Sequence, residues 1–299
     1  MRRIFGVVAL VLGAFLLMAA ALGQFWAPSH AERTPLDVHT TTRLTGTAQK
    51  LDPTSGQVQD LQVKASNVTK SDTHKSDGDV VSFVTTSCLV IDKDNVPDCV
   101  AANDPQNRLI SASSDVFASN RHTAEAVDNA KFTTSKAVPH VGLTNKWPFD
   151  AQRKTYQYWD GTLVKAVPAT YAATETVGGL RTYRYDVDVQ PTDAEVVQGV
   201  KGKYSTQQSI WIEPRTGAII KQTQKQVRTQ ANGDPLLNLD ITYTSATIKA
   251  AADQASSKIS GLRLVTQILP IAGLVGGVVL VVLGLFLLLG AHRRGAHVS

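Results

Sequence analysis

The side chains that could carry out catalysis form no recognised catalytic motif in this sequence. The chain contains no Gly-x-Ser-x-Gly elbow, His-Glu-x-x-His pair, P-loop or Gly-x-Gly-x-x-Gly loop. Asp186 and Asp188 share one face of a strand-like segment, where solvation explains them better than acid–base chemistry. The histidines of the central region lack the spacing of metal ligands; they are His30, His39, His74, His122 and His140. We therefore expect no enzyme, no cofactor and no metal, with convergence of distant residues as the open alternative.

The two cysteines, Cys88 and Cys99, flank a short polar segment that contains a proline. A hairpin would bring the two thiols face to face, and a disulfide closing such a loop contributes about 3 kcal/mol in the chain-entropy model. We predict this disulfide, and with it an oxidising compartment, over two buried free thiols. Asp92, Asp94 and Asp98 lie in the same segment, but the Gly and terminal Glu of an EF-hand loop are missing, so a solvated turn is expected.

Five aromatic residues fall within the 13 positions from Trp147 to Trp159. They could support a core hairpin that turns at Asp160-Gly161, or they could line a ligand site. The predicted ligand-binding residues are Trp147, Phe149, Tyr156 and Tyr158. If the segment is a strand, Tyr156 and Tyr158 lie on one face and Trp159 on the other, so we expect a structural role for Trp159.

Two apolar runs, Ile4–Phe25 and Ile268–Ala291, lie on either side of the region that contains these residues. Each is long enough to cross a hydrocarbon core of about 30 Å as a helix. Arginines at positions 2, 3, 293 and 294 flank the runs on their outer sides, so the positive-inside rule places both termini in the cytoplasm. The first run could instead be a signal peptide cleaved after Ala21, but its length favours a retained helix.

These runs predict four regions of the chain. We expect a transmembrane helix or signal anchor at 1–25, an exported β-rich domain at 26–263 that ends in a membrane-proximal helix, a transmembrane helix at 264–291 and a cytoplasmic tail at 292–299. Four of the five net positive charges belong to the flanking arginines. The central region is therefore nearly neutral, which argues against nucleic acid as a partner.

The central region is predicted to be an antiparallel β-structure within a mainly β (α+β) fold. Strands are expected at Val80–Ile91, Leu180–Val189 and Leu239–Ile248, which are rich in β-branched and aromatic residues. Pro214 and Gly217 mark the turn of a hairpin within 204–223. Helices are expected at Ala250–Leu262 and around Ser119–Ala130. Pro270 predicts a kink at the start of the second apolar run.

The chain resembles a known family through Trp147-Pro-Phe-Asp150, Tyr156-x-Tyr-Trp-Asp-Gly161 and Trp211-Ile-Glu-Pro-Arg-Thr-Gly-Ala-Ile-Ile220. With the two apolar runs, these motifs resemble the actinobacterial envelope proteins of the porin PorA family. The resemblance implies a periplasmic domain tethered to the inner membrane. One mycobacterial member is a polar growth factor, which implies a partnership with the transporter that exports trehalose monomycolate. It supplies no catalytic residues.

The leading functional hypothesis is a non-enzymatic membrane protein that hands over a mycolate glycolipid, with the inner membrane and a lipid transporter as partners. The alternative is a scaffold that binds no lipid. Its support is the small-residue spacing of Gly273 and Gly277, and of Ala9 and Gly13, which allows close helix packing. The third hypothesis is a pore, as the family label suggests, or a hydrolase with an unrecognised site. Helical spans at both ends argue against a pore, because an outer-membrane barrel crosses its membrane with strands.

Overall fold

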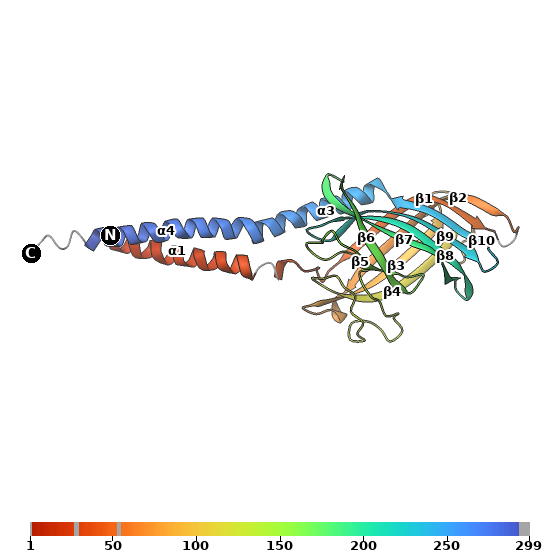
Figure 1. Ribbon diagram of the computed structural model, residues 1–299, viewed down its shortest axis with the longest axis horizontal. Coiled ribbons are helices and arrows are strands. Elements are labelled where there is room, and N and C mark those ends of the chain that lie inside the picture. The colour runs from red at the N-terminus through yellow and green to blue at the C-terminus, as the bar shows by residue number, and fades with distance from the viewer. Residues whose placement is uncertain (1, 27–29, 53–54, 293–299) are drawn as a thin grey trace, which may run out of the picture. The chain divides into compact units, whose positions relative to one another are not determined.

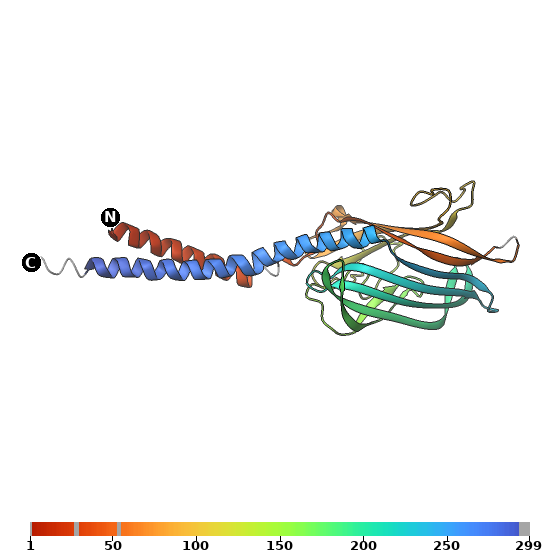
Figure 2. The same ribbon diagram turned by 90° about the horizontal axis from the view of Figure 1, so that it is seen from above.

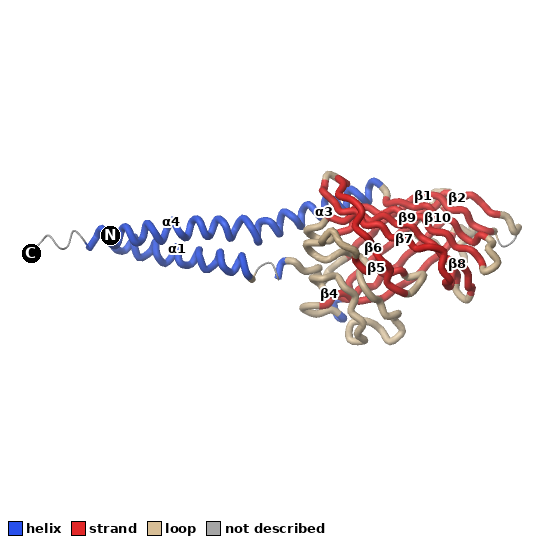
Figure 3. Tube along the Cα trace, in the orientation of Figure 1, coloured by secondary structure: helices blue, strands red, loops and turns tan. Residues whose placement is uncertain are grey.

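The computed structural model describes residues 2–26, 30–52 and 55–292, with side chains up to residue 289. Residues 1–33 and 257–299 make one compact unit, and residues 34–256 make a second. Helices build the first unit and a β-sheet builds the second (Figure 1, Figure 3).

The helical unit contains α1 (Arg2–Phe25) and α4 (Leu269–His292). Both belong to helices that are long and apolar enough to cross a membrane. α4 continues from α3 (Ser245–Arg263) through a π-helical turn at Leu264–Ile268. This irregularity ends two positions before Pro270, which lacks a backbone N–H and whose ring crowds the preceding turn. The two apolar runs seen in the sequence correspond to α1 and α4.

Small residues bring α1 and α4 close together. The buried residues of α1 are Gly6, Ala9, Gly13 and Ala20. A Cβ atom added to Gly13 would lie 2.9 Å from the carbonyl oxygen of Gly277, and one added to Gly284 would lie 2.9 Å from that of Gly6. Larger residues at these positions would push the backbones apart.

The second unit is a ten-stranded antiparallel sheet that curls into a half-barrel (Figure 2). The order across the sheet is β4-β3-β2-β1-β10-β9-β8-β7-β6-β5. The first meander consists of β1 (His39–Leu51), β2 (Val58–Asp72), β3 (Val80–Ile91) and β4 (Leu109–Asn120), with a short 3₁₀ helix η1 (Thr73–Lys75) between β2 and β3. The second consists of β5 (Tyr156–Asp160), β6 (Lys165–Val177), β7 (Leu180–Val197), β8 (Val200–Glu213), β9 (Ala218–Gln230) and β10 (Pro235–Tyr243). The meanders join where β1 pairs with β10.

The strands follow from residues that alternate between two faces. On β7, Tyr185, Val187 and Val189 are buried, whereas Arg184 and Asp186 on the other face remain half-buried or exposed. We call the face that carries Tyr185 and Val187 the inner face. It is the concave one, because the Tyr204 hydroxyl on β8 donates a hydrogen bond of 2.9 Å to Asp160 at the end of β5, three strands away.

The segment between β4 and β5 links the two edge strands of the sheet. Single-residue bridges pair Ser119 of β4 with Ala126, Glu125 with Leu143, and Leu143 with Tyr158 of β5. These bridges satisfy part of the hydrogen-bonding capacity that an open edge would expose.

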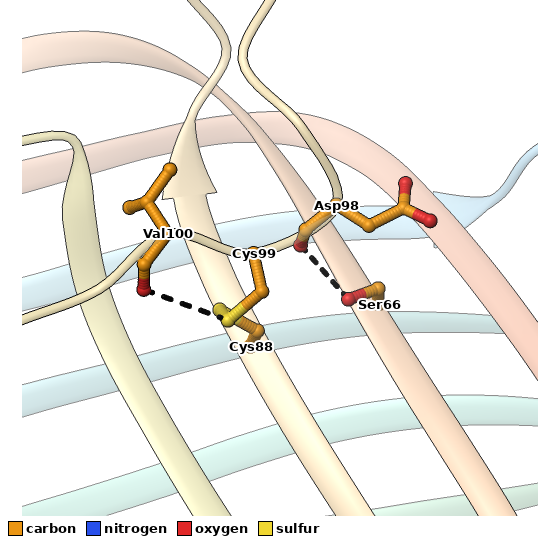
Figure 4. Close-up of a disulfide and its surroundings, with 5 residues drawn as sticks. All are labelled: Ser66, Cys88, Asp98, Cys99 and Val100. Atoms are coloured by element: carbon orange, nitrogen blue, oxygen red, sulfur yellow. Dashed lines mark hydrogen bonds between the residues drawn. A yellow bond between two sulfur atoms is a disulfide. The ribbon is translucent and has the colours of Figure 1, made fainter.

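The disulfide expected from the sequence is present between Cys88 and Cys99 (Figure 4). It holds the loop after β3 against the outer face of the sheet, where the Ser66 hydroxyl donates to the carbonyl of Asp98 at 2.9 Å. The Asp98 carboxylate also pairs with Arg43 on β1. The loop is therefore tied to three strands.

The expected mainly β architecture is confirmed, with two local corrections. β3 coincides with the predicted Val80–Ile91, and β8 and β9 form the hairpin that turns at Pro214–Gly217. The strand predicted at Leu239–Ile248 ends at Tyr243, because α3 begins at Ser245. The helix predicted around Ser119–Ala130 is wrong: β4 runs to Asn120 and the residues after it form turns and bridges.

Candidate functional site

The inner face of the half-barrel carries most of the buried side chains of the sheet. Direct cross-strand pairs put Tyr156, Val187, Gln208, Gln224 and Ile241 in one row, because residues opposite each other in a ladder share a face. Apolar clusters lie at the two ends of this row, one including Tyr156 and Val187 and the other including Ile241. One centres on Tyr185 and Ile210 and the other on Leu239 and Leu44.

A polar stripe on β8 and β9 lies between the two apolar clusters, which both also contact Ile219 on β9. It consists of Thr206, Gln208, Gln222, Gln224 and Gln226. The Gln222 amide donates to Gln208 at 3.2 Å, and the Gln224 amide lies 3.3 Å from both Thr206 and Gln226. Neutral amides and a hydroxyl present donors and acceptors without charge. Such a stripe is suited to a neutral, hydroxyl-rich ligand.

Trp147 reaches the same face from the loop before β5. Its side chain is fully buried, and its ring packs against Tyr158 and Tyr185 at centroid distances of 5.3 and 5.2 Å. Its indole N–H has no hydrogen-bond partner among the described residues. Buried donors in proteins are nearly always paired, but this N–H is enclosed by its neighbours, so a ligand could reach it only if the surrounding side chains moved.

Tyr158 and Tyr243 also point into the half-barrel, from β5 and β10. Tyr158 is half-buried, and no hydrogen bond of its hydroxyl is found within the described part of the chain. Burial raises the pKa of Tyr158 well above its usual value, with smaller contributions from Tyr243 and Asp160. Burial likewise raises the pKa of Tyr243 to about 12. Both phenols are therefore neutral hydrogen-bonding groups at physiological pH.

The structure brings three of the four predicted ligand residues together. Trp147, Tyr156 and Tyr158 share one cluster of the inner face. Phe149 lies elsewhere, stacked on His122 at 6.0 Å with the Lys146 ammonium 3.7 Å from its ring centroid.

Trp159 follows the alternation of β5 and packs outside this cluster. Its ring lies 4.3 Å from that of His140, which contacts Asp115 through Nε2 at 2.9 Å and the carbonyl of Val138 through Nδ1 at 2.8 Å. Trp159 thus contributes to the link between the two edges of the sheet.

Sequence reasoning missed the glutamine stripe and Tyr243. The sequence did contain a signal, because Gln222, Gln224 and Gln226 recur at every second position and must share one face of a strand. The contribution of Tyr243 depends on β10 lying opposite β5 across the half-barrel, which no local pattern encodes.

The acidic residues have partners of their own. Asp92 lies 3.4 Å from Lys64, and Asp98 pairs with Arg43 at 2.7 Å. Asp186 accepts a hydrogen bond from Ser209 at 2.8 Å on the outer face. Within the described residues no group of three or more His, Cys, Asp or Glu side chains could hold a metal ion.

Gly273 and Gly277 face α1 within the same chain. A Cβ on Gly277 would lie 2.9 Å from the carbonyl oxygen of Gly13, and one on Gly273 would lie 3.1 Å from that of Leu16. The small-residue spacing thus serves packing between the chain's own two helices.

Comparison with known protein families identifies the family of this chain. The family model described as porin PorA matches residues 5–286, from the first turns of α1 through the whole sheet into the second half of α4. The chain belongs to the porin PorA family. No curated protein matches it. The matched residues cover most of both apolar helices and the whole half-barrel, so the family model describes the complete architecture of this envelope protein.

Proposed function

We propose that this porin PorA family protein is a membrane-anchored carrier of an envelope glycolipid. α1 and α4 hold it in the inner membrane with both termini in the cytoplasm, and the half-barrel lies outside. The flanking arginines support this orientation. The Cys88–Cys99 disulfide supports an oxidising, extracytoplasmic location for the sheet.

The observation that carries the proposal is the division of the inner face into apolar and polar areas. The apolar clusters offer contacts to acyl chains. The glutamine stripe and the half-buried Tyr158 hydroxyl offer hydrogen bonds to sugar hydroxyls. Ligand sites commonly combine an apolar lining with a few placed polar groups. Trehalose monomycolate, with a neutral sugar and a long acyl chain, has the matching chemistry. The protein would hand it over beside an inner-membrane lipid transporter without catalysing a reaction.

Pore formation, which the family description suggests, fits the outer face poorly. A transmembrane barrel presents apolar side chains to lipid. The outer face here carries ion pairs between exposed side chains, such as Lys203 with Asp193 at 2.8 Å and Lys225 with Asp240 at 3.6 Å. Charges in the lipid-facing position are strongly destabilising.

A scaffold without bound lipid is the second candidate function. Its sequence support was the glycine spacing in the second apolar run. The glycines at 273 and 277 pack against α1, so they give no argument for a separate partner helix.

The test is mass spectrometry of lipids that co-purify with the full chain, followed by titration with trehalose monomycolate. We expect bound glycolipid, and weaker binding for Gln224→Leu on the inner face. Gln207→Leu is the matched control, because Gln207 is exposed on the opposite face of the adjacent β8. A chain that carries no lipid and binds no added glycolipid refutes the proposal and favours the scaffold.

A further inference from the structure

The helical unit contains an apolar groove between α1 and α4. Its volume is about 590 Å³, within the range of small-molecule sites of about 300–1,000 Å³. The residues that line it include Arg2, Phe5, Ala9, Leu12, Leu283 and Leu287. Arg2 is the one charged residue of this lining, and all others are apolar.

The groove follows from the way the two helices pack. Gly6 and Gly13 on α1 meet Gly284 and Gly277 on α4 at backbone distance. Beside this contact Ala9 is 7% exposed, so its single methyl group leaves a shallow floor. Phe5 and Leu283 stand on either side of the floor with 65% and 49% of their surfaces exposed. Because the helices are held together by small residues, the large side chains form walls instead of filling the space.

Arg2 has no acidic residue beside it on α1 or α4. Neither Arg2–Phe25 nor Leu269–His292 contains an aspartate or glutamate. No ion pair of Arg2 occurs among the residues that the structure describes. An anion that pairs with this guanidinium would come from outside these helices, and the planar donors of an arginine match the oxygens of a phosphate.

We propose that this groove binds an anionic phospholipid, with one acyl chain between the walls and the phosphate paired with Arg2. The proposal rests on α1 and α4 lying in a bilayer, as proposed above, but not on the glycolipid site of the sheet. The bilayer itself supplies a phosphate above each acyl chain. A further protein helix would have to supply both an apolar face for the groove and an acidic residue at the level of Arg2, whereas a phospholipid carries both groups in one molecule.

Native mass spectrometry of the full chain in detergent tests the site, with phosphatidylglycerol and phosphatidylcholine as probes. We expect the chain to retain phosphatidylglycerol in preference to phosphatidylcholine. Arg2→Gln should weaken phosphatidylglycerol retention about fivefold, the effect of one basic residue at a lipid surface. Arg3→Gln is the matched control, because it removes the same charge from a residue outside the groove lining and changes the flanking charge equally.

Bulk in the groove gives a second, independent arm. Ala9→Phe should fill the floor and abolish retention, whereas Val11→Phe adds a comparable ring at a position that is 63% exposed and outside the lining, and should change nothing. If Ala9→Phe disturbs helix packing, Leu283→Trp closes the groove from its exposed wall. Equal retention of both lipids, or equal effects of the groove variants and their controls, overturns the proposal. Glycolipid binding to the sheet should be unaffected by all of these variants, so either proposal can fail alone.

Discussion

Removing a single hydroxyl from Tyr158 should separate binding from stability. Tyr158→Phe keeps the ring that packs against Trp147 and deletes an oxygen without a hydrogen-bond partner among the described residues. The free energy of unfolding should change by less than about 1 kcal/mol, since no bond is lost. If the hydroxyl bonds a glycolipid, its loss should cost about 0.5–1.5 kcal/mol of binding, a rise in Kd of roughly twofold to tenfold.

Tyr204→Phe is the matched control for this experiment. It deletes the same atom from the same face, but the Tyr204 hydroxyl donates to the buried Asp160 carboxylate at 2.9 Å. Hydrogen bonds to charged groups contribute about 1.5–3 kcal/mol, so Tyr204→Phe should lower the free energy of unfolding by about that amount. Its effect on glycolipid affinity should be small, because the hydroxyl is already occupied.

Denaturant unfolding of the two variants and titration with trehalose monomycolate measure both quantities. We expect opposite profiles: loss of affinity for Tyr158→Phe and loss of stability for Tyr204→Phe. If Tyr158→Phe destabilises the sheet as much as Tyr204→Phe and leaves affinity unchanged, Tyr158 belongs to the core and the ligand site lies elsewhere.

Three further predictions concern the helices, the loop after β3 and acid stability. Gly13→Leu should separate α1 from α4 and lower the melting temperature of the helices in detergent, measured by circular dichroism. Gly276→Leu should leave that melting temperature unchanged, because a Cβ at Gly276 would lie 3.5 Å from its nearest neighbour, a methyl carbon of Leu16. Cys88→Ala should lower the free energy of unfolding by about 3 kcal/mol, and urea unfolding of the wild type in reductant should show the same loss. Hydrogen bonds from the side chain and the backbone N–H of Arg108 lower the pKa of Asp104 to about 2. Its stabilising contribution is therefore present above about pH 4 and lost as the pH falls toward 2, so Asp104→Asn should reduce the difference between melting temperatures at pH 5 and pH 2.5.

The strands that could be predicted were those whose residues carry the signal locally. β3 is rich in β-branched and aromatic residues, and β7 alternates strictly at Tyr183–Val189. The Pro214–Gly217 turn could be predicted because proline and glycine favour turns. In the structure Gly217 takes a φ of +70°, and a Cβ there would also meet the carbonyl of Trp147.

The two wrong predictions arose from side chains that bond to the backbone. Thr244 looked like part of a strand, but its hydroxyl accepts from the N–H of Thr247 at 3.2 Å and so caps α3. Asn120 was placed in a helix, but its side-chain oxygen accepts from the N–H groups of His122 and Thr123 at 2.9 Å each. This bonding favours a turn over a helix.

The site could be predicted only in part. The aromatic cluster was evident from composition, and alternation placed Tyr156 and Tyr158 on one face. The separation of Phe149 from Trp147, two positions apart, depends on the path of an irregular loop. The approach of Tyr158 and Tyr243 depends on sheet curvature, which arises from contacts between strands far apart in the sequence.

The pairing of β1 with β10 determines when this sheet can form. Leu44 pairs with Tyr243, about 200 positions later, whereas within each meander neighbouring strands are joined by local hairpins. Such non-local contacts slow folding, because the chain must close a long loop before the pairing stabilises it. An exported chain would present β1 as an unpaired edge until β10 has crossed the membrane. Unpaired strand edges favour aggregation, so the first meander is open to wrong pairing until the whole domain has been synthesised.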